Sequence, residues 1–288
     1  MARARQTFER RQLGLALRRL RLDKGVPQKA AAEAIGRSRT KVVELEEGNG
    51  TLSGDDLARL LDYYAVSGAE REAMLALGAQ ARRRKRGRTY VDLLPNSYQR
   101  FADLEANAAR ISTYEPGIVP GLLQSSDYIR AVIEEGDGIW WDGADPGRED
   151  RISFRLDRQA VVFGAGEPKD LRFVLTEDSL RADFGAPEVM RGQLRHLLSL
   201  CDGRPGPAIR LLRNDTHPNP LRGRALILFD FKGKAPAVGY SEAIAGHSAY
   251  YDDPADTAAL ALAFERVWEL AATEPGTERF IRELLEEL

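Results

Sequence analysis

The side chains best suited to chemistry in this sequence lie between residues 38 and 47, where groups that can read DNA bases recur one helical turn apart. Arg39 can donate two hydrogen bonds to O6 and N7 of guanine, which discriminates against other bases by about 1–3 kcal/mol. Glu44 can accept from the amino group of cytosine, and Thr40 can contact a polar base edge or the methyl group of thymine. This spacing predicts a short helix that enters the major groove of double-stranded DNA.

Other polar side chains nearby are suited to holding phosphates, which fixes the position of a protein on DNA without reading its sequence. Gln28, Ser38 and Lys41 are predicted to make such contacts. The full set of candidate DNA-binding residues is Gln28, Arg37, Ser38, Arg39, Thr40, Lys41 and Glu44. For Arg39, the alternative is a solvated surface arginine with no role in recognition.

The elements that must position these side chains are predicted from apolar spacing, glycines and capping residues. A first helix is expected before Gly25, with a stripe formed by Leu13, Leu17, Leu20 and Leu22. Further helices are expected over about 28–35, 38–47, 53–61 and 69–83. The second and third are separated by a turn at Gly36, and a short helix, a glycine turn and another short helix form the helix-turn-helix pattern.

Within this pattern, Ile35, Val42 and Leu45 are expected to face inward. The segment GVPQKAAAEAIGRSRTKVVELEEG, residues 25–48, resembles the Xre-type (lambda-repressor-like) helix-turn-helix. The matching positions are Gln28, Gly36, Val42, Leu45, Glu46 and Gly48. The resemblance implies an all-α head of five helices that binds operator DNA. It also implies an internal ion pair between Arg21 and Glu46, rather than a DNA contact for Glu46.

The distribution of charge agrees with a DNA-binding head. Residues 1–90 contain 20 Lys and Arg against 11 Asp and Glu, whereas residues 91–288 contain 22 against 33. The first part is therefore basic and the second acidic, although the whole chain has a net charge of only −2. Two basic flanks are candidates for further DNA contacts: an arm with Arg3, Arg5, Arg10 and Arg11, and the run 82–88, for which a solvated helix end is the equal alternative.

The chain is predicted to divide into a head, residues 1–88, and an α+β regulatory or dimerisation domain, residues 89–288. Helices in the second part are expected over about 97–112, 126–135, 148–162, 187–201, 254–272 and 277–288. Strands are expected over 171–175, 209–212, 225–231 and 237–241.

The second part also carries a recognisable motif. The segment TYEPGIVPGLLQSSDYIRAV, residues 113–132, is similar to the motif of a large actinobacterial group in which an Xre-type head precedes a domain of unknown function. FVLTEDSLR, residues 173–181, is a further match. The resemblance implies an antitoxin-like transcriptional regulator that acts with a small partner protein.

Two features of the second part leave alternatives open. Tyr114, Glu115 and Gln124 either tie the motif loop down by hydrogen bonds, which we favour, or line a pocket. Trp140 and Trp141 either form the rim of a ligand pocket or protein interface, or fold onto the core.

The sequence gives little support for catalysis. His196, His217 and His247 have no patterned nucleophile or carboxylate beside them, and no phosphate-binding glycine loop is present. The single cysteine, Cys201, is more typical of a buried apolar position than of a nucleophile. No cofactor or metal site is therefore predicted. The sequence has no apolar run long enough for a membrane helix and no secretory signal pattern, so a cytoplasmic protein is expected.

These observations together predict a transcriptional regulator that binds operator DNA as a homodimer and has no enzymatic activity. A small protein partner is expected to modulate it through the C-terminal domain. A small-molecule effector is the alternative, and an enzyme with an appended DNA-binding head is a more distant one.

Overall fold

The computed structural model describes residues 7–82, 89–91, 97–137, 139, 147–184, 186–203, 206–233, 235–242 and 248–288. The chain forms two compact units, one of Met1–Asn107 with Asp230–Thr257 and one of Ala108–Phe229 with Ala258–Leu288. The predicted boundary after residue 88 adjoins a stretch, 83–88, that lies outside the described residues, so the proposed division at that point stays a prediction.

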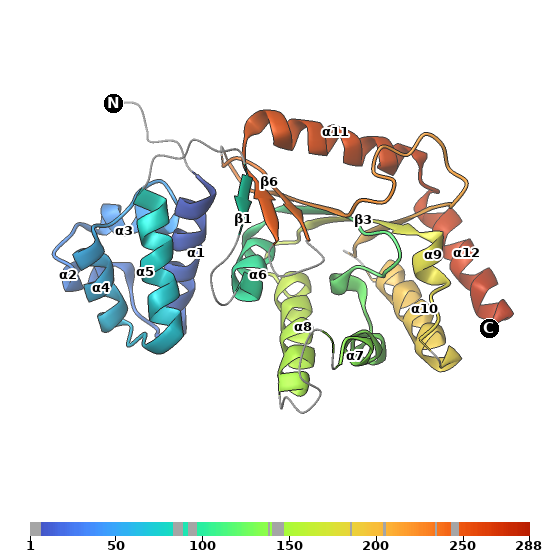
Figure 1. Ribbon diagram of the computed structural model, residues 1–288, viewed down its shortest axis with the longest axis horizontal. Helices are drawn as coiled ribbons and strands as arrows, with labels where there is room; N and C mark the ends of the chain where they lie inside the picture. Colours follow the sequence, from blue (N-terminus) through green and yellow to red (C-terminus); the bar gives the residue numbers. More distant parts are fainter. Residues whose placement is uncertain are drawn as a thin grey trace. The chain divides into compact units, whose positions relative to one another are not determined.

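The first unit begins with the predicted helices (Figure 1). They are α1 (Phe8–Asp23), α2 (Gln28–Ala34), α3 (Arg39–Glu46), α4 (Gly54–Tyr63) and α5 (Gly68–Arg82). The side chains of Thr7, Ser38 and Ser53 accept backbone hydrogen bonds at the starts of α1, α3 and α4, as residues at this position commonly do. Gly25 and Gly36 have φ values of 63° and 64°, which lets the chain turn after α1 and α2 without steric strain.

A continuous core holds these helices together. Ile35, Val42 and Leu45 are at most 1% exposed, which confirms their predicted inward orientation. Leu13, Leu17 and Leu20 belong to the same buried cluster. Leu22 was expected there but is 56% exposed, because a residue two positions after Leu20 lies on another face of the helix.

The first unit also contains β1 (Thr89–Val91), α6 (Ser97–Asn107), β6 (Val238–Ser241) and β7 (Ala249–Tyr251). β7 pairs antiparallel with β1 on one side and with β6 on the other. β1 and β7 were not expected from the sequence, because three-residue strands are too short to show an alternating pattern.

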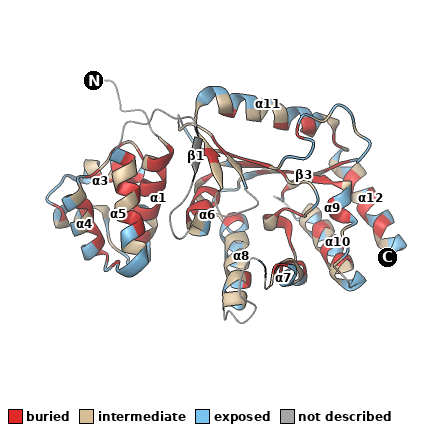
Figure 2. Ribbon diagram, in the orientation of Figure 1, coloured by how far each residue is buried: buried red, intermediate tan, exposed pale blue. Residues whose placement is uncertain are grey.

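These elements bury a second face of α1, so that most of this helix is buried (Figure 2). The Phe8 ring stacks on Tyr250 at 4.4 Å between centroids, and the backbone nitrogen of Phe8 donates to Asp252. Arg19 forms an ion pair of 3.2 Å with the buried Asp103 of α6. Phe8 and Leu15 are buried, yet neither belongs to the core cluster of α1–α5.

The buried position of Arg11 corrects its predicted place in a DNA-reaching arm. Its side chain lies over the Phe231 ring at 3.9 Å, and Nη2 donates to the carbonyl oxygen of Pro236 at 2.7 Å. Burial lowers the pKa of Arg11 to about 10, because the charged guanidinium has lost much of its hydration. Nε of Arg10 donates to the carbonyl oxygen of Ala81. Arg3 and Arg5 lie outside the described residues.

The second unit contains a sheet in the order β5-β2-β3-β4, in which β2, β3 and β4 are parallel. α11 lies on one face of this sheet, and α7 and α10 lie on the other (Figure 1). The strands are β2 (Arg110–Tyr114), β3 (Asp170–Thr176), β4 (Ala208–Leu212) and β5 (Leu226–Asp230). The helices are η1 (Gly121–Leu123), α7 (Ser126–Glu135), α8 (Gly147–Phe163), α9 (Glu177–Leu180), α10 (Pro187–Asp202), α11 (Pro254–Leu270) and α12 (Glu274–Glu287).

One predicted helix, which spans the boundary between the two units, is wrong at its end. The expected helix over 97–112 stops at Asn107, and residues 110–114 form β2 instead. Ile111 fits the helical stripe of α6 by spacing, but it is a strand residue paired with Leu171 of β3. Pairing with a distant strand overrides the local helical pattern here.

The motif loop between β2 and α7 and the strand before it are held by hydrogen bonds of polar side chains. The hydroxyl of Tyr128 accepts from the backbone nitrogen of Val119, and Nε2 of Gln124 donates to the carbonyl oxygen of Val119. The hydroxyl of Tyr114 accepts from Nδ2 of Asn219. These bonds agree with the favoured tying role of Tyr114 and Gln124. Trp140 and Trp141 lie outside the described residues.

Candidate nucleic-acid interface

The candidate interface is built on α3, which is fixed to the head by one face only. Val42 and Leu45 are buried in the head core, and Ser38 caps the start of the helix by accepting from the backbone nitrogen of Lys41 at 3.3 Å. Because the buried side chains lie on one side, the remaining positions of the helix face solvent. A helix of this size fits the major groove of B-form DNA.

The three residues predicted to read bases are all exposed on this helix. Arg39, Thr40 and Glu44 are all exposed, and no described residue makes a side-chain hydrogen bond or ion pair with them. Their polar ends are thus available to a ligand without first breaking a contact within the described part of the chain. Lys41 is half-buried, with its ammonium group beside Gly50.

The predicted ion pair between Arg21 and Glu46 is present and buried. Nε of Arg21 lies 2.5 Å from Oε1 of Glu46, and Nη2 lies 2.9 Å from Oε2. The hydrogen bond to Glu46 raises the pKa of Arg21, which stays charged. Nη1 of Arg21 also donates to the carbonyl oxygen of Val26, so this arginine joins α1, the turn before α2 and the end of α3.

Gln28 belongs to the same buried arrangement. Its Nε2 donates to Oε2 of Glu46 at 3.0 Å, and the residue is half-buried. The structure therefore places the side-chain amide of Gln28 on α3, where it helps to fix the start of α2 to the end of the candidate recognition helix. Its predicted phosphate contact stays a prediction.

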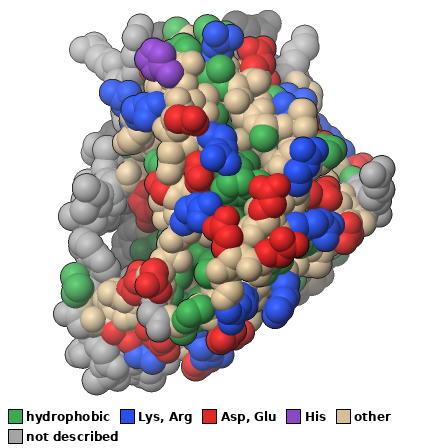
Figure 3. Space-filling model, turned by 90° about the vertical axis from the view of Figure 1, so that its right-hand side faces the viewer, with side chains coloured by type: hydrophobic (Ala, Val, Ile, Leu, Met, Phe, Trp, Pro, Cys, Tyr) green, Lys and Arg blue, Asp and Glu red, His purple; other side chains and the backbone are tan. Residues whose placement is uncertain are grey.

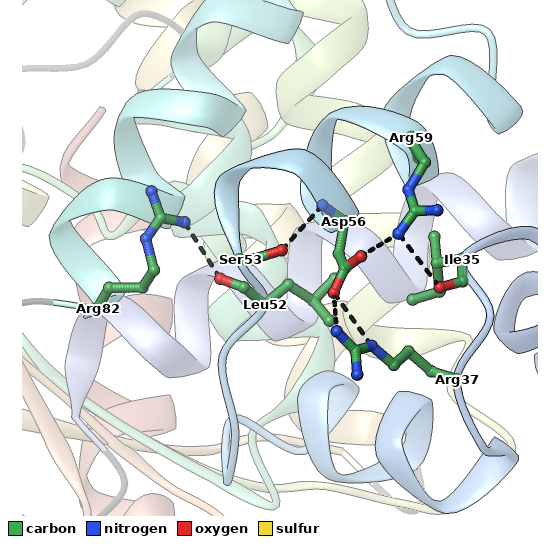
Figure 4. Close-up of polar contacts among 7 residues, drawn as sticks. All are labelled: Ile35, Arg37, Leu52, Ser53, Asp56, Arg59 and Arg82. Carbon is green, nitrogen blue, oxygen red and sulfur yellow. Dashed lines mark hydrogen bonds and ion pairs between the residues drawn. The ribbon is translucent and has the colours of Figure 1, made fainter.

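Arg37 is joined to a buried carboxylate that sequence reasoning missed (Figure 4). Nε and Nη2 of Arg37 donate to Oδ2 of Asp56 at 3.1 and 2.6 Å, and Nη2 of Arg59 donates to Oδ1 of the same residue. The side chain of Asp56 is 4% exposed, whereas those of Arg37 and Arg59 are 52% and 57% exposed. One buried carboxylate therefore holds two exposed guanidinium groups.

The sequence contained a signal for this arrangement. Ser53 and Asp56 are the first and fourth residues of a helix-start pattern, and the hydroxyl of Ser53 accepts from the backbone nitrogen of Asp56 at 3.1 Å. Arg59 follows three residues after Asp56, which places the two side chains on neighbouring positions of one helix face. The partnership with Arg37 could not be seen, because it depends on how α4 packs against the turn between α2 and α3.

The Asp56 contacts predict a defined pH dependence of stability. Hydrogen bonds from Arg37, and then from Arg59, hold the pKa of Asp56 below its ordinary value. A carboxylate with a lowered pKa in the folded state stabilises it above the unfolded pKa of about 3.9, and this contribution is lost as the pH falls through the folded pKa. The destabilisation caused by Asp56→Asn is therefore expected to be larger at pH 7 than at pH 3.

Urea unfolding of the wild-type and Asp56→Asn chains at both pH values measures this difference. Asp55→Asn is the matched control, since Asp55 is exposed in the same first turn of α4. An Asp56→Asn effect that is equal at pH 7 and pH 3 would contradict a charged, hydrogen-bonded Asp56.

A metal centre has no support among the described residues. No group of three or more His, Cys, Asp or Glu residues among them is placed to hold a metal. Burial raises the pKa of the Cys201 thiol to about 11, so the thiol is protonated at neutral pH. None of the described helices combines the length and apolar composition needed to cross a lipid bilayer.

Comparison with solved structures gives partial likenesses to proteins that act on genes or chromatin. The clp gene regulator ClgR from Corynebacterium glutamicum is 34% identical over 27% of this chain and 84% of that chain, with a TM-score of 0.23. TrmBL2, an archaeal chromatin protein, is 15% identical over 76% of this chain and 67% of that chain, with a TM-score of 0.30. None of the curated proteins matches the chain.

Two family models match the chain. A helix-turn-helix domain model matches residues 12–74, which confirms the predicted helix-turn-helix and contains every candidate DNA-binding residue. A model described as a domain of unknown function, DUF5753, matches residues 98–283. Because this second match covers more than half of the 288 residues, the chain belongs to the DUF5753 family and carries a helix-turn-helix domain before the family's domain.

Proposed function

We propose that this protein is a sequence-specific DNA-binding transcriptional regulator of the Xre type, in which α3 reads the major groove of operator DNA. The observation that carries the proposal is the exposed set Arg39, Thr40 and Glu44 on a helix whose opposite face is buried in a helix-turn-helix domain. Arg39 recognises guanine, while Ser38 and Lys41 lie near the phosphates at the start of the helix.

In this proposal the C-terminal region forms homodimers, so that two copies of α3 reach half-sites about one turn of DNA apart. The same region receives the signal of a small protein partner. Residues 91–288 are acidic overall, which supports assigning DNA contact to the head alone. Figure 3 shows the face that lies on the right-hand side of Figure 1. On this face acidic and basic side chains are interspersed, without a continuous basic patch.

Arg39→Ala tests the DNA-reading role of α3. Genomic fragments bound by the wild-type chain first supply a preferred sequence. On that sequence the variant is expected to bind roughly 5–150-fold more weakly, because a bidentate contact to guanine is worth about 1–3 kcal/mol of discrimination. Its affinity for random DNA is expected to change little. Fluorescence anisotropy with both DNAs measures the two affinities.

Arg71→Ala is the matched control for the loss of one positive charge. Arg71 pairs with Asp62 at 2.8 Å, at the far end of α4 from Asp56. This variant is expected to retain the preference for the selected sequence. Equal weakening of Arg39→Ala on selected and random DNA would refute base reading by Arg39, and a wild-type chain that selects no sequence would refute the proposed function.

A small-molecule effector is the second candidate signal for the C-terminal region. Thermal shift measurements on the full chain, with a metabolite collection and separately with small proteins encoded beside its gene, distinguish the two. A ligand that binds the folded chain raises its melting temperature, and the class of molecule that does so identifies the signal.

A further inference from the structure

Two arginines converge on one carboxylate at the edge of the candidate DNA surface. Arg37 precedes Ser38, the capping residue of α3, and Nη2 of Arg59 lies 3.5 Å from the carbonyl oxygen of Ile35 in the turn between α2 and α3. Both guanidinium groups therefore sit beside the start of α3, although Arg59 comes from α4. Figure 4 shows the two side chains reaching Asp56 from different elements.

The contacts to Asp56 leave donors on both arginines unused. A guanidinium group has five N–H donors. Arg37 uses Nε and Nη2, and Arg59 uses Nη2, for the bonds to Asp56 and Ile35. Within the described parts of the chain, Nη1 of Arg37 and both Nε and Nη1 of Arg59 have no hydrogen-bond acceptor. Since both side chains are more than half exposed, these donors are open to an anion.

The charges also leave a net attraction for an anion. Two guanidinium groups face a single carboxylate, so the cluster carries a net charge of +1. Asp56 is buried and orients both arginines, which removes part of the entropy that long side chains lose on binding. An oriented guanidinium group matches the oxygen geometry of a phosphate.

We infer that Arg37 and Arg59, positioned by Asp56, form a clamp for one phosphate of the DNA backbone beside the start of α3. The inference rests on the proposed function and adds to it a residue from α4, Arg59, together with the positioning residue Asp56. The clamp fixes the position of α3 in the groove and reads no base.

The salt dependence of DNA binding tests the clamp in the full-length chain. Arg59→Ala is expected to weaken binding to the selected sequence and to random DNA by a similar factor, roughly tenfold. The slope of log affinity against log salt concentration is expected to become shallower by about 0.9, the value for one lost phosphate contact. Arg71→Ala removes the same charge from an arginine paired elsewhere on α4, and it is expected to leave the slope unchanged.

Asp56→Asn gives a second, independent test. This substitution removes a negative charge near DNA, so simple attraction predicts tighter binding. The clamp predicts weaker binding instead, because the two arginines lose the group that orients them. Circular dichroism and thermal unfolding establish that each variant folds, and Arg59→Ala, which changes an exposed side chain, keeps the test independent of any instability of Asp56→Asn.

The outcomes separate this inference from the function on which it rests. If the wild-type chain binds a selected sequence and Arg59→Ala has the same affinity and salt slope, the clamp is wrong and the proposed function stands. Tighter binding by Asp56→Asn would show that Asp56 does not position the arginines for DNA. If the wild-type chain binds no DNA, the proposed function and the clamp both fall.

Discussion

Glu46→Ala is expected to lower the free energy of unfolding of the head by about 3–5 kcal/mol, the cost of leaving one partner of a buried ion pair uncompensated. Arg21 would remain buried and charged. It would keep its hydrogen bond to the carbonyl oxygen of Val26 but lose both bonds to the carboxylate of Glu46. The substitution also removes the acceptor for Gln28, so α1, α2 and α3 lose a shared contact at once. Calorimetry of the full-length chain measures the loss of stability.

Two variants serve as controls for Glu46→Ala. Glu47→Ala removes an exposed carboxylate one residue further along, and a surface change of this kind is expected to stay within about 0.5 kcal/mol. The double variant Arg21→Met with Glu46→Leu replaces the pair by apolar side chains and is expected to recover most of the stability. A melting temperature of Glu46→Ala equal to that of the wild type would show that the pair contributes nothing.

Gly14→Ala is expected to destabilise the head by about 3 kcal/mol, at the upper end of the usual cost of overpacking. A methyl group on Gly14 would lie 2.4 Å from the carbonyl oxygen of Leu45 and 2.8 Å from that of Glu46. Both atoms belong to the backbone of α3, so α1 and α3 must move apart. Because that movement also shifts the candidate recognition helix, the affinity for the selected DNA is expected to fall as well.

Gly192→Ala is the matched control for Gly14→Ala. Gly192 lies inside α10, and a methyl group there would meet nothing within 4 Å. Since alanine favours a helix by about 0.8–1.0 kcal/mol over glycine, this variant is expected to be slightly more stable than the wild type. Thermal unfolding of both variants checks the pair of predictions, and a neutral Gly14→Ala would contradict the close contact between α1 and α3.

The helix-turn-helix could be predicted from the sequence because its signals are local. Gly36, Ser38 and the apolar positions Val42 and Leu45 lie within ten residues, and capping, turn geometry and helical periodicity each act over that range. The same local signals predict that Arg39, Thr40 and Glu44 face outward, and all three are exposed.

The features that could not be predicted depend on contacts between distant residues. The strand pairing of Ile111 with Leu171 and the stacking of Phe8 on Tyr250 join positions 60 or more residues apart. Arg37 was expected among outward-facing residues, and it is exposed, but its hydrogen bonds to Asp56 required the packing of α4. A pattern of residue types along one segment carries no information about such partners.

The double burial of α1 limits how far the helix-turn-helix can be exchanged between proteins. Phe8, Gln12 and Leu15 are covered although they lie outside the apolar cluster of the head. A chimera that joins residues 1–88 to an unrelated body would expose these side chains to water, with the cost of hydrating the two apolar ones. Substitutions on α1 must therefore satisfy two sets of neighbours, whereas Arg39, Thr40 and Glu44 of α3 can change without breaking a side-chain hydrogen bond or ion pair to the described residues.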